Sequence, residues 1–167
     1  MFPKPVKNPV APVCALFLTF AAAGCTQSAS VLDEFATSST HTATSGYSAR
    51  DKDCMARAMF FESHRSSREG MIAVGTVVMN RVDSPRYPNS VCEVVGQRNQ
   101  FAPGVMSRSM NSPALPDVEE AAVAVLRGER HTEVHTAKFF HQAGLTFPYS
   151  NMHYVLEAGG NAFYERR

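Results

Sequence analysis

Glu62 is the residue in this sequence whose surroundings best suit acid–base chemistry. One face of the helix that we expect to end around Ser63 presents, at helical spacing, Met55, Ala58, Met59 and Glu62. A carboxyl group on such an apolar face, close to the negative end of the helix dipole, should have a raised pKa. A raised pKa suits a proton donor at neutral pH. The alternative interpretation is an ordinary, exposed glutamate at a helix end.

Two helices have to position this glutamate. The first is expected to begin at a capping residue, either Asp51 or Asp53. The second follows a capping-box pattern, Ser66-Ser-Arg-Glu69, which gives Glu69 a structural role. Apolar residues then occupy both faces from Met71 to Val82. This second helix should therefore be central and mostly buried.

The remaining segments predict an α+β fold, mostly helical, with a small antiparallel β element near the C-terminus. Further helices are expected at 91–97 and, behind a cap near Asp117, at 119–127. The stretch 100–116 is irregular, as binding loops often are. The β element should comprise a strand at 136–141 and a hairpin of 152–156 with 161–164, turning at Gly159-Gly160.

Length and charge limit the classes of function. The 167 residues, 44% of them hydrophobic, suffice for one domain, residues 47–167, with extensions. The formal net charge of +1 provides no broad basic surface. Nucleic acid is therefore not an expected partner.

The first residues have the pattern of an export signal. In residues 1–24, two lysines precede an apolar run that ends in small residues. The segment Ala22-Ala-Gly-Cys25 resembles a bacterial lipobox, in which the cysteine is lipidated, and the alternative is simple cleavage after Ala23. By that resemblance, Thr26 favours the outer membrane, so we expect a periplasmic protein anchored there through a lipid on Cys25. Residues 25–46, rich in serine and threonine, would form a flexible tether.

The four cysteines divide into two groups. Cys14 lies in the export signal and Cys25 in the lipobox, which leaves Cys54 and Cys92 in the folded domain. An exported protein reaches a compartment that permits oxidation, so we expect these two to form a disulfide. Two buried thiols are the alternative.

Several different short motifs lie at defined distances from one another along the domain. They are Glu62, Glu69-Gly70, Ala73-Val74, Val77-Val78, Asn80-Arg81, Pro88, Val91-Cys92, Val94-Val95, Gln100-Phe101, Phe140-His141, Pro148 and Phe163-Tyr164. In this pattern the chain from about Cys54 to Tyr164 resembles the SleB/CwlJ-type cell wall hydrolases, a group that includes spore-cortex-lytic enzymes.

Three positions depart from that family's pattern. The family has Ala-Arg-Gly-Glu after its catalytic glutamate, whereas this chain has Ser63-His64-Arg65-Ser66 and lacks the second glutamate. The C-terminal Gly-Asn-His-x-Phe-Tyr is here the shorter 160–164, without the histidine. Tyr149 stands where a tryptophan is expected. These changes leave Glu62 in place and concern the contacts with substrate.

The resemblance implies a lysozyme-like domain that cleaves peptidoglycan with Glu62 as acid and base and with no cofactor. It also implies that substrate is bound by Gln100, Phe101, His141, Tyr149 and Tyr164. The alternatives are a loop-end amide for Gln100 and core packing for Phe101 and Tyr164. We interpret Asn80 and Arg81 as structural support, in which Asn80 fixes the following loop or Glu62 and Arg81 pairs with an acidic side chain.

The number of carboxylates favours one reaction. Glycoside hydrolysis needs a second carboxylate, about 5 Å from the acid for retention or about 6.5–9.5 Å for inversion. The nearest candidate, Glu69, is better explained as a capping residue. A lytic transglycosylase needs no such partner, because the muramyl 6-hydroxyl attacks the anomeric carbon. We therefore expect lytic transglycosylation between N-acetylmuramic acid and N-acetylglucosamine.

Two other functions stay open. A zinc amidase that removes the stem peptide would need metal ligands, and His131 and His135 are four residues apart. Their context is a loop, however, and no third ligand has a clear spacing, so no metal site is expected. A non-catalytic, peptidoglycan-binding lipoprotein on a degenerate hydrolase fold would explain the departures from the family's motifs.

Overall fold

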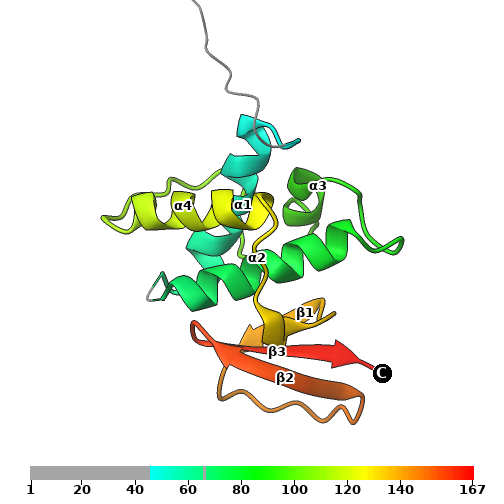
Figure 1. The fold of residues 1–167 in the computed structure, drawn as a ribbon. Helices are drawn as coiled ribbons and strands as arrows, with labels where there is room; N and C mark the ends of the chain where they lie inside the picture. Colours follow the sequence, from blue (N-terminus) through cyan, green and yellow to red (C-terminus); the bar gives the residue numbers. More distant parts are fainter. Residues whose placement is uncertain (1–45, 66) are drawn as a thin grey trace, which may run out of the picture. The chain divides into compact units, whose positions relative to one another are not determined.

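The computed structural model describes residues 46–65 and 67–167, which form four α-helices, a short 3-10 helix and a three-stranded sheet (Figure 1). Helix α2 (Arg68–Val82) separates the other three α-helices from the sheet. None of the described helices is long and apolar enough to cross a membrane. The predicted export signal, the lipid on Cys25 and the tether up to residue 45 lie outside the described residues. The predicted fold class, α-rich with a small antiparallel β element near the C-terminus, is confirmed.

Helix α1 (Ala49–Glu62) ends where the sequence predicted but begins earlier. Its cap is Ser48, whose hydroxyl accepts a hydrogen bond from the backbone N–H of Asp51 at 3.1 Å. The Asp51 carboxylate in turn accepts one from the Ser48 N–H at 3.0 Å. The predicted start at Asp51 or Asp53 was wrong, because Ser48 and Asp51 together satisfy two backbone donors where a lone aspartate would satisfy one.

Helix α2 is buried on nearly every side, as predicted, but its capping box is incomplete. Every residue from Gly70 to Met79 is buried. The cap is Ser67, whose hydroxyl accepts a hydrogen bond from the Gly70 N–H at 3.1 Å. Glu69 is therefore only the second helical residue and is exposed. Its predicted capping role is wrong, since a capping box needs the acidic residue one position later.

Two glycines allow the last hairpin to approach the start of α2. A Cβ added to Gly70 would lie 2.4 Å from the Cα of Gly159, closer than side-chain carbons approach backbone. Gly159 also has a positive φ of 55°, which suits the turn that it forms with Gly160. Backbone therefore packs directly on backbone at this point, which accounts for the Gly70 of the Glu-Gly motif.

Helices α3 (Val91–Val95) and α4 (Leu115–Leu126) complete the helical part. The predicted cap near Asp117 was wrong, because α4 starts two residues before that aspartate with Pro116 in its first turn. Proline needs no hydrogen-bond partner there and its φ is already helical. Gly128, with φ 110°, follows the end of α4, as predicted. Residues 97–114 contain neither helix nor strand.

The sheet consists of β1 (Phe139–Gln142), β2 (Met152–Ala158) and β3 (Asn161–Arg166), with β3 in the centre and both pairings antiparallel. The predicted hairpin at Gly159-Gly160 is confirmed. The strand predicted at 136–141 begins only at Phe139, because a 3-10 helix (Thr132–Val134) and a turn precede it.

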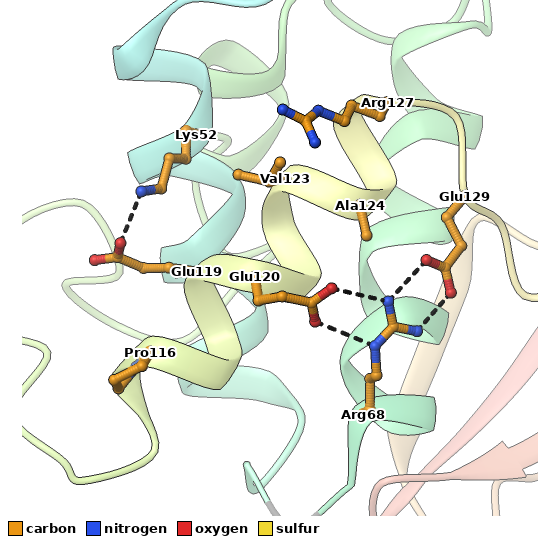
Figure 2. A pocket seen from close by; sticks show the side chains of 9 residues that line it. All are labelled: Lys52, Arg68, Pro116, Glu119, Glu120, Val123, Ala124, Arg127 and Glu129. Carbon is orange, nitrogen blue, oxygen red and sulfur yellow. Dashed lines mark hydrogen bonds and ion pairs between the residues drawn. The ribbon is translucent and has the colours of Figure 1, made fainter. Parts of the chain in front are cut away.

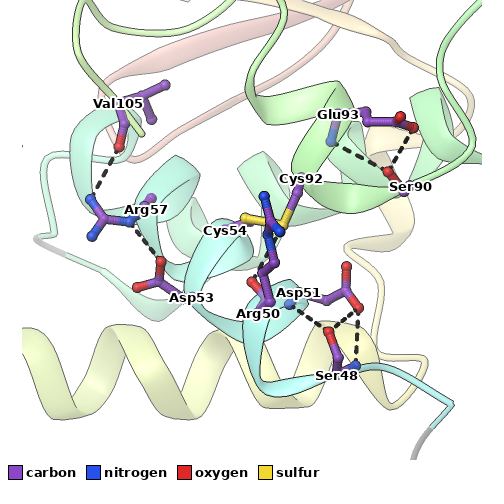
Figure 3. Close-up of a disulfide and its surroundings, with 10 residues drawn as sticks. All are labelled: Ser48, Arg50, Asp51, Asp53, Cys54, Arg57, Ser90, Cys92, Glu93 and Val105. Atoms are coloured by element: carbon purple, nitrogen blue, oxygen red, sulfur yellow. Dashed lines mark hydrogen bonds and ion pairs between the residues drawn. A yellow bond between two sulfur atoms is a disulfide. The ribbon is translucent and has the colours of Figure 1, made fainter. Parts of the chain in front are cut away.

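The disulfide expected between Cys54 and Cys92 is present (Figure 3). It joins the middle of α1 to α3, across 38 residues of sequence, with an S–S distance of 2.09 Å. Cys54 is buried and Cys92 is half-buried. The bond therefore fixes α3 to the helix that ends in Glu62.

Candidate active site

Glu62 is the last residue of α1 and lies at the edge of the core. The residues that share its helical face, Met55, Ala58 and Met59, are each 0% exposed. Glu62 itself is half-buried and lines a pocket of about 350 Å³. The other residues that line this pocket are Phe61, His64, Asn99, Gln100, Phe101, Ala102, Phe140, His141, Gln142 and Asn161. The apolar face predicted from the sequence thus carries the carboxyl group into a pocket.

Two hydrogen bonds fix Glu62, one at its side chain and one at its backbone. Its side-chain Oε1 accepts a hydrogen bond from the backbone N–H of Ala102 at 2.5 Å. Its backbone carbonyl accepts one from the side-chain amide of Asn161 at 2.6 Å. Oε2 accepts no hydrogen bond from the described residues, so it is the oxygen better placed to exchange a proton with a molecule in the pocket.

The end of α1 is stabilised by side chains from the residues that follow it. The hydroxyl of Ser63 donates to the carbonyl of Met59 at 2.7 Å, and Arg65 donates to the carbonyl of Phe60, also at 2.7 Å. The Ser63 hydroxyl adds a second bond to the Met59 carbonyl, which already accepts one from the Ser63 N–H, and Arg65 gives the Phe60 carbonyl a partner. The helix end is therefore held rigidly at the position of Glu62.

The pKa of the Glu62 carboxyl is raised above its usual range. Burial in the pocket is the main cause, because it disfavours the charged form. The Ala102 N–H and the positive charge of Arg81 act in the opposite direction, and burial prevails. The shift predicted from the apolar helix face thus has the predicted sign and main cause.

Arg81 is a buried cation behind the pocket. Its side chain is 3% exposed, and its Nε donates to the carbonyl of Lys138 at 2.8 Å. The guanidinium lies over the rings of Tyr87 and Phe101, at 5.5 and 5.2 Å from their centres. No described acidic side chain pairs with it directly, so the expected ion pair was wrong. Arg81 instead acts on Glu62 through space, and it supports the ring that precedes Ala102.

Asn80 holds the segment that leads into β1. Its side-chain amide donates to the carbonyls of His135 and Ala137, at 3.0 and 2.9 Å. With the bond from Arg81 to Lys138, these contacts fasten that segment to the end of α2. Asn80 therefore fixes the segment before β1 and not the loop that follows α2, and it makes no described hydrogen bond to Glu62.

The predicted substrate-binding residues separate into two groups. Gln100, Phe101 and His141 line the same pocket as Glu62. Tyr164 does not line it and is 7% exposed, with its ring stacked on Phe139 at 5.4 Å. Tyr149 is 59% exposed and stacks on Phe147, away from the lining of this pocket.

Ala102 and Asn161 contribute to the site but were not predicted from the sequence. Ala102 acts through its backbone N–H, which no residue type could reveal. Asn161 belongs to the Gly-Asn pattern of the C-terminal motif, and that pattern was the available signal. His64 also lines the pocket, in the left-handed region at φ 52° and against Gly160.

Among the described residues that line the pocket, Glu62 is the sole carboxylate. Glu69 lies elsewhere, where its side chain is 3.4 Å from the ring of His131. The backbone N–H of that histidine donates to the hydroxyl of Thr76 at 2.9 Å. His135 is exposed, and its carbonyl accepts from Asn80. In residues 46–65 and 67–167, no three His, Cys, Asp or Glu side chains gather as a metal site would require.

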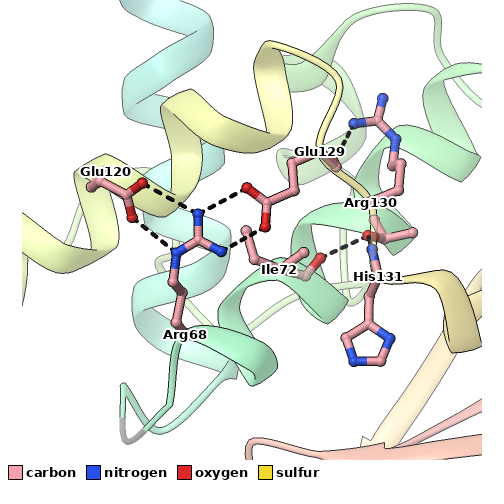
Figure 4. Close-up of polar contacts among 7 residues, drawn as sticks. Arg68, Ile72, Glu120, Glu129, Arg130 and His131 are labelled. Atoms are coloured by element: carbon pink, nitrogen blue, oxygen red, sulfur yellow. Dashed lines mark hydrogen bonds and ion pairs between the residues drawn. The ribbon is translucent and has the colours of Figure 1, made fainter.

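A larger hollow of about 700 Å³ lies over α4, away from Glu62 (Figure 2). It is lined by three cations and three carboxylates, so its net charge is close to zero, and among the described residues only Arg127 of these cations has no carboxylate partner. Arg68 contacts both Glu120 and Glu129, and Lys52 contacts Glu119 at 2.7 Å. Figure 4 shows the Arg68 guanidinium held between its two carboxylates. This hollow therefore offers little unsatisfied charge to a ligand.

Comparison with known proteins assigns the chain to a family. A family described as Cell Wall Hydrolase matches residues 65–164, a stretch that starts just after Glu62. The spore cortex-lytic enzymes of Bacillus subtilis and Bacillus cereus are 38% and 39% identical over 50 and 56 residues. Those segments cover 30% and 34% of this chain but only 16% and 22% of the relatives' own length.

Two solved structures share the fold. The catalytic domain of the Bacillus cereus SleB protein aligns with a TM-score of 0.60 at 22% identity, over 72% of this chain and 93% of that one. The catalytic domain of the germination-specific lytic transglycosylase SleB from Bacillus anthracis aligns with a TM-score of 0.59 at 23% identity, over 72% and 98%. The expected lysozyme-like fold is thereby confirmed.

Proposed function

Because this chain belongs to the cell wall hydrolase family, we propose that it cleaves the glycan strands of peptidoglycan as a lytic transglycosylase, with Glu62 as acid and base. One observation carries this proposal: a half-buried glutamate with a raised pKa is the sole carboxylate among the described residues of its pocket. A raised pKa keeps a larger fraction of the acid protonated near neutral pH.

The reaction needs two proton transfers at one oxygen. Protonated Oε2 of Glu62 donates its proton to the glycosidic oxygen, and the bond from that oxygen to the anomeric carbon of N-acetylmuramic acid breaks. The 6-hydroxyl of the same sugar then bonds to the anomeric carbon and gives its proton to the Glu62 carboxylate. The products are a 1,6-anhydromuramic end and a new 4-hydroxyl on N-acetylglucosamine, and the acid is regenerated.

The surroundings of Glu62 support this assignment. The Ala102 N–H holds Oε1 and stabilises the carboxylate that exists between the two transfers. The charge of Arg81 acts on the same intermediate state. Hydrolysis by retention or inversion would require a second carboxylate within about 10 Å. Gln100, Phe101 and His141, which line the pocket, are the proposed contacts with sugar.

Product analysis tests the proposal. Wild-type protein should convert purified sacculi to muropeptides with anhydromuramic ends, detectable by mass spectrometry. Glu62→Gln should lower the rate by at least about a hundredfold, the usual contribution of a general acid. Glu69→Gln, an exposed glutamate outside the pocket, should keep the wild-type rate. Reducing muramic ends would instead identify a muramidase, and released stem peptides an amidase.

The proposed site of action is the periplasmic face of the outer membrane. This proposal rests on the export-signal pattern and on the lipobox-like segment that ends in Cys25. Cys25→Ala should shift the protein from the membrane to the soluble fraction of lysed cells. An unchanged distribution would contradict lipid anchoring.

A further inference from the structure

A second hollow, of about 620 Å³, adjoins the pocket of Glu62. Each is lined in part by β1 and in part by the loop around 97–102, and Gln100 lines both. The residues of this second hollow are Arg86, Tyr87, Gln97, Gln100, Thr136, Lys138, Phe139, Glu165 and Arg166. Because Gln100 lines both, the two hollows lie close together.

Three cations line the second hollow: Arg86, Lys138 and Arg166. Within the described part of the chain, none of them forms an ion pair with a carboxylate, in contrast to Lys52 and Arg68 in the hollow over α4 (Figure 2). The chain as a whole carries a formal charge of only +1. Positive charge is thus concentrated locally, where an anionic group could bind.

The contacts of these cations leave their charge available. Arg166 lies over the ring of Phe139 at 4.8 Å, an arrangement that orients the guanidinium without neutralising it. Among the described residues, the Lys138 ammonium donates only to the carbonyl of Thr136, at 3.3 Å. The one carboxylate of the hollow, Glu165, already accepts hydrogen bonds from Thr136 and Arg167.

Gln97 adds an acceptor to this cationic hollow. Its side-chain oxygen is buried and has no hydrogen-bond partner among the described residues. Rotation of the Gln97 side chain toward the hollow would give this acceptor a partner when the ligand brings an N–H group. A ligand with carboxylates and N–H groups in one short chain is a peptide with acidic termini or side chains.

We propose that this hollow, defined by Arg86, Lys138, Arg166 and Gln97, binds the carboxylate-bearing stem peptide attached to the muramic acid at the cleavage site. The proposal rests on the proposed function, because that function brings a peptide-substituted muramic acid next to Glu62. The cations receive the peptide carboxylates, and the Gln97 oxygen receives a peptide N–H. The enzyme would then recognise peptide-bearing strands rather than bare glycan.

Calorimetric titration of full-length wild-type protein with a sugar-free stem peptide at low salt tests this site. The expected result is binding that weakens about two- to fivefold for each of Arg86→Gln, Lys138→Gln and Arg166→Gln, as for single charge pairs at a surface. The double variant of Arg86 and Lys138 should weaken it about tenfold. Arg127→Gln, which removes an exposed cation from the hollow over α4, is the matched control and should bind like wild type.

A peptide with amidated carboxyl groups provides the second control and should bind wild type as weakly as the double variant binds the acidic peptide. Thermal unfolding of each variant verifies that it is folded. Equal binding of the two peptides, equal binding by the cation variants, or no binding at millimolar peptide would overturn the proposal. The titration involves no bond cleavage, so its failure would leave the proposed reaction standing, and loss of that reaction would leave the titration interpretable.

Discussion

The side-chain amide of Asn161, at the start of β3, donates a hydrogen bond to the carbonyl oxygen of Glu62, at the end of α1, over 2.6 Å. Asn161 is 6% exposed, so water cannot easily replace it. The last hairpin therefore holds the helix end that carries the candidate acid. It does so across 99 residues of sequence.

Replacing Asn161 should weaken both fold and activity. Asn161→Ala leaves the carbonyl of Glu62 without this donor, which should lower the free energy of unfolding by about 1–3 kcal/mol. Glycan cleavage should fall as well, because the Glu62 side chain loses its fixed position. Urea denaturation and digestion of sacculi measure the two effects. Asn151→Ala, at an exposed asparagine, is the control, and equal behaviour of the two variants would refute this role.

Arg81 should set the upper pH limit of activity. Its positive charge lowers the pKa of Glu62, and activity is lost as pH rises through that pKa, because the acid must be protonated. Removing the charge in Arg81→Met should raise the pKa and move the alkaline limb of the kcat/KM profile to higher pH. Arg81→Lys, which keeps the charge, should leave the limb closer to its original position. A shift toward acid in Arg81→Met would contradict this account.

The same carboxyl should make the folded state less stable at neutral pH. Its pKa in the folded protein is raised above the ordinary value of 4.5, so protonated Glu62 contributes stability that is complete below that ordinary value and is lost as pH rises through the folded pKa. Glutamine does not titrate. Glu62→Gln should therefore unfold at a higher temperature than wild type near pH 8, with the difference shrinking toward pH 4. A difference independent of pH would indicate another cause, and Glu69→Gln serves as control.

The disulfide should contribute substantially to the free energy of unfolding. Closing a loop of 38 residues stabilises a domain by about 3–4 kcal/mol through the entropy of the unfolded chain. The double variant Cys54→Ala with Cys92→Ala should lose about that amount in urea denaturation. Wild-type protein treated with a reductant should unfold at a similar urea concentration. Wild type that is insensitive to reductant would show that the bond contributes nothing.

Gly70→Ala should disturb the contact between α2 and the last hairpin. The added methyl would lie 2.4 Å from the Cα of Gly159, so backbone has to move, at a cost of about 1–3 kcal/mol. Gly46→Ala is the matched control, because nothing lies within 4 Å of its added Cβ. Thermal unfolding compares the two. If Gly70→Ala were as stable as the control, the hairpin would be able to shift without a loss of stability.

Local sequence patterns were sufficient to predict most of the fold. The burial of α2 follows from apolar residues on both of its faces, and the hairpin follows from Gly159-Gly160 between two short apolar runs. Helix starts were predicted less well. At α1 the cap is Ser48, which with Asp51 satisfies two backbone donors, and not one of the two aspartates. At α2 the choice lay between two adjacent serines, Ser66 and Ser67, which the local pattern does not distinguish.

The candidate site was only partly accessible from sequence. The apolar face of α1 identified Glu62, because burial of that face is a local property. The Ala102 N–H and the distance of Arg81 from Glu62 are set by chain segments that meet only in three dimensions. The cationic hollow likewise draws Arg86, Lys138 and Arg166 from a loop, the segment before β1 and the end of β3. No sequence window contains that arrangement.

The bond between Asn161 and Glu62 also bears on how the protein is made. A ribosome that has released α1 still has to synthesise nearly a hundred residues before the partner of that helix end exists. Unfinished or prematurely terminated chains therefore cannot assemble the pocket. Under the proposed function, only completed molecules would therefore act on peptidoglycan.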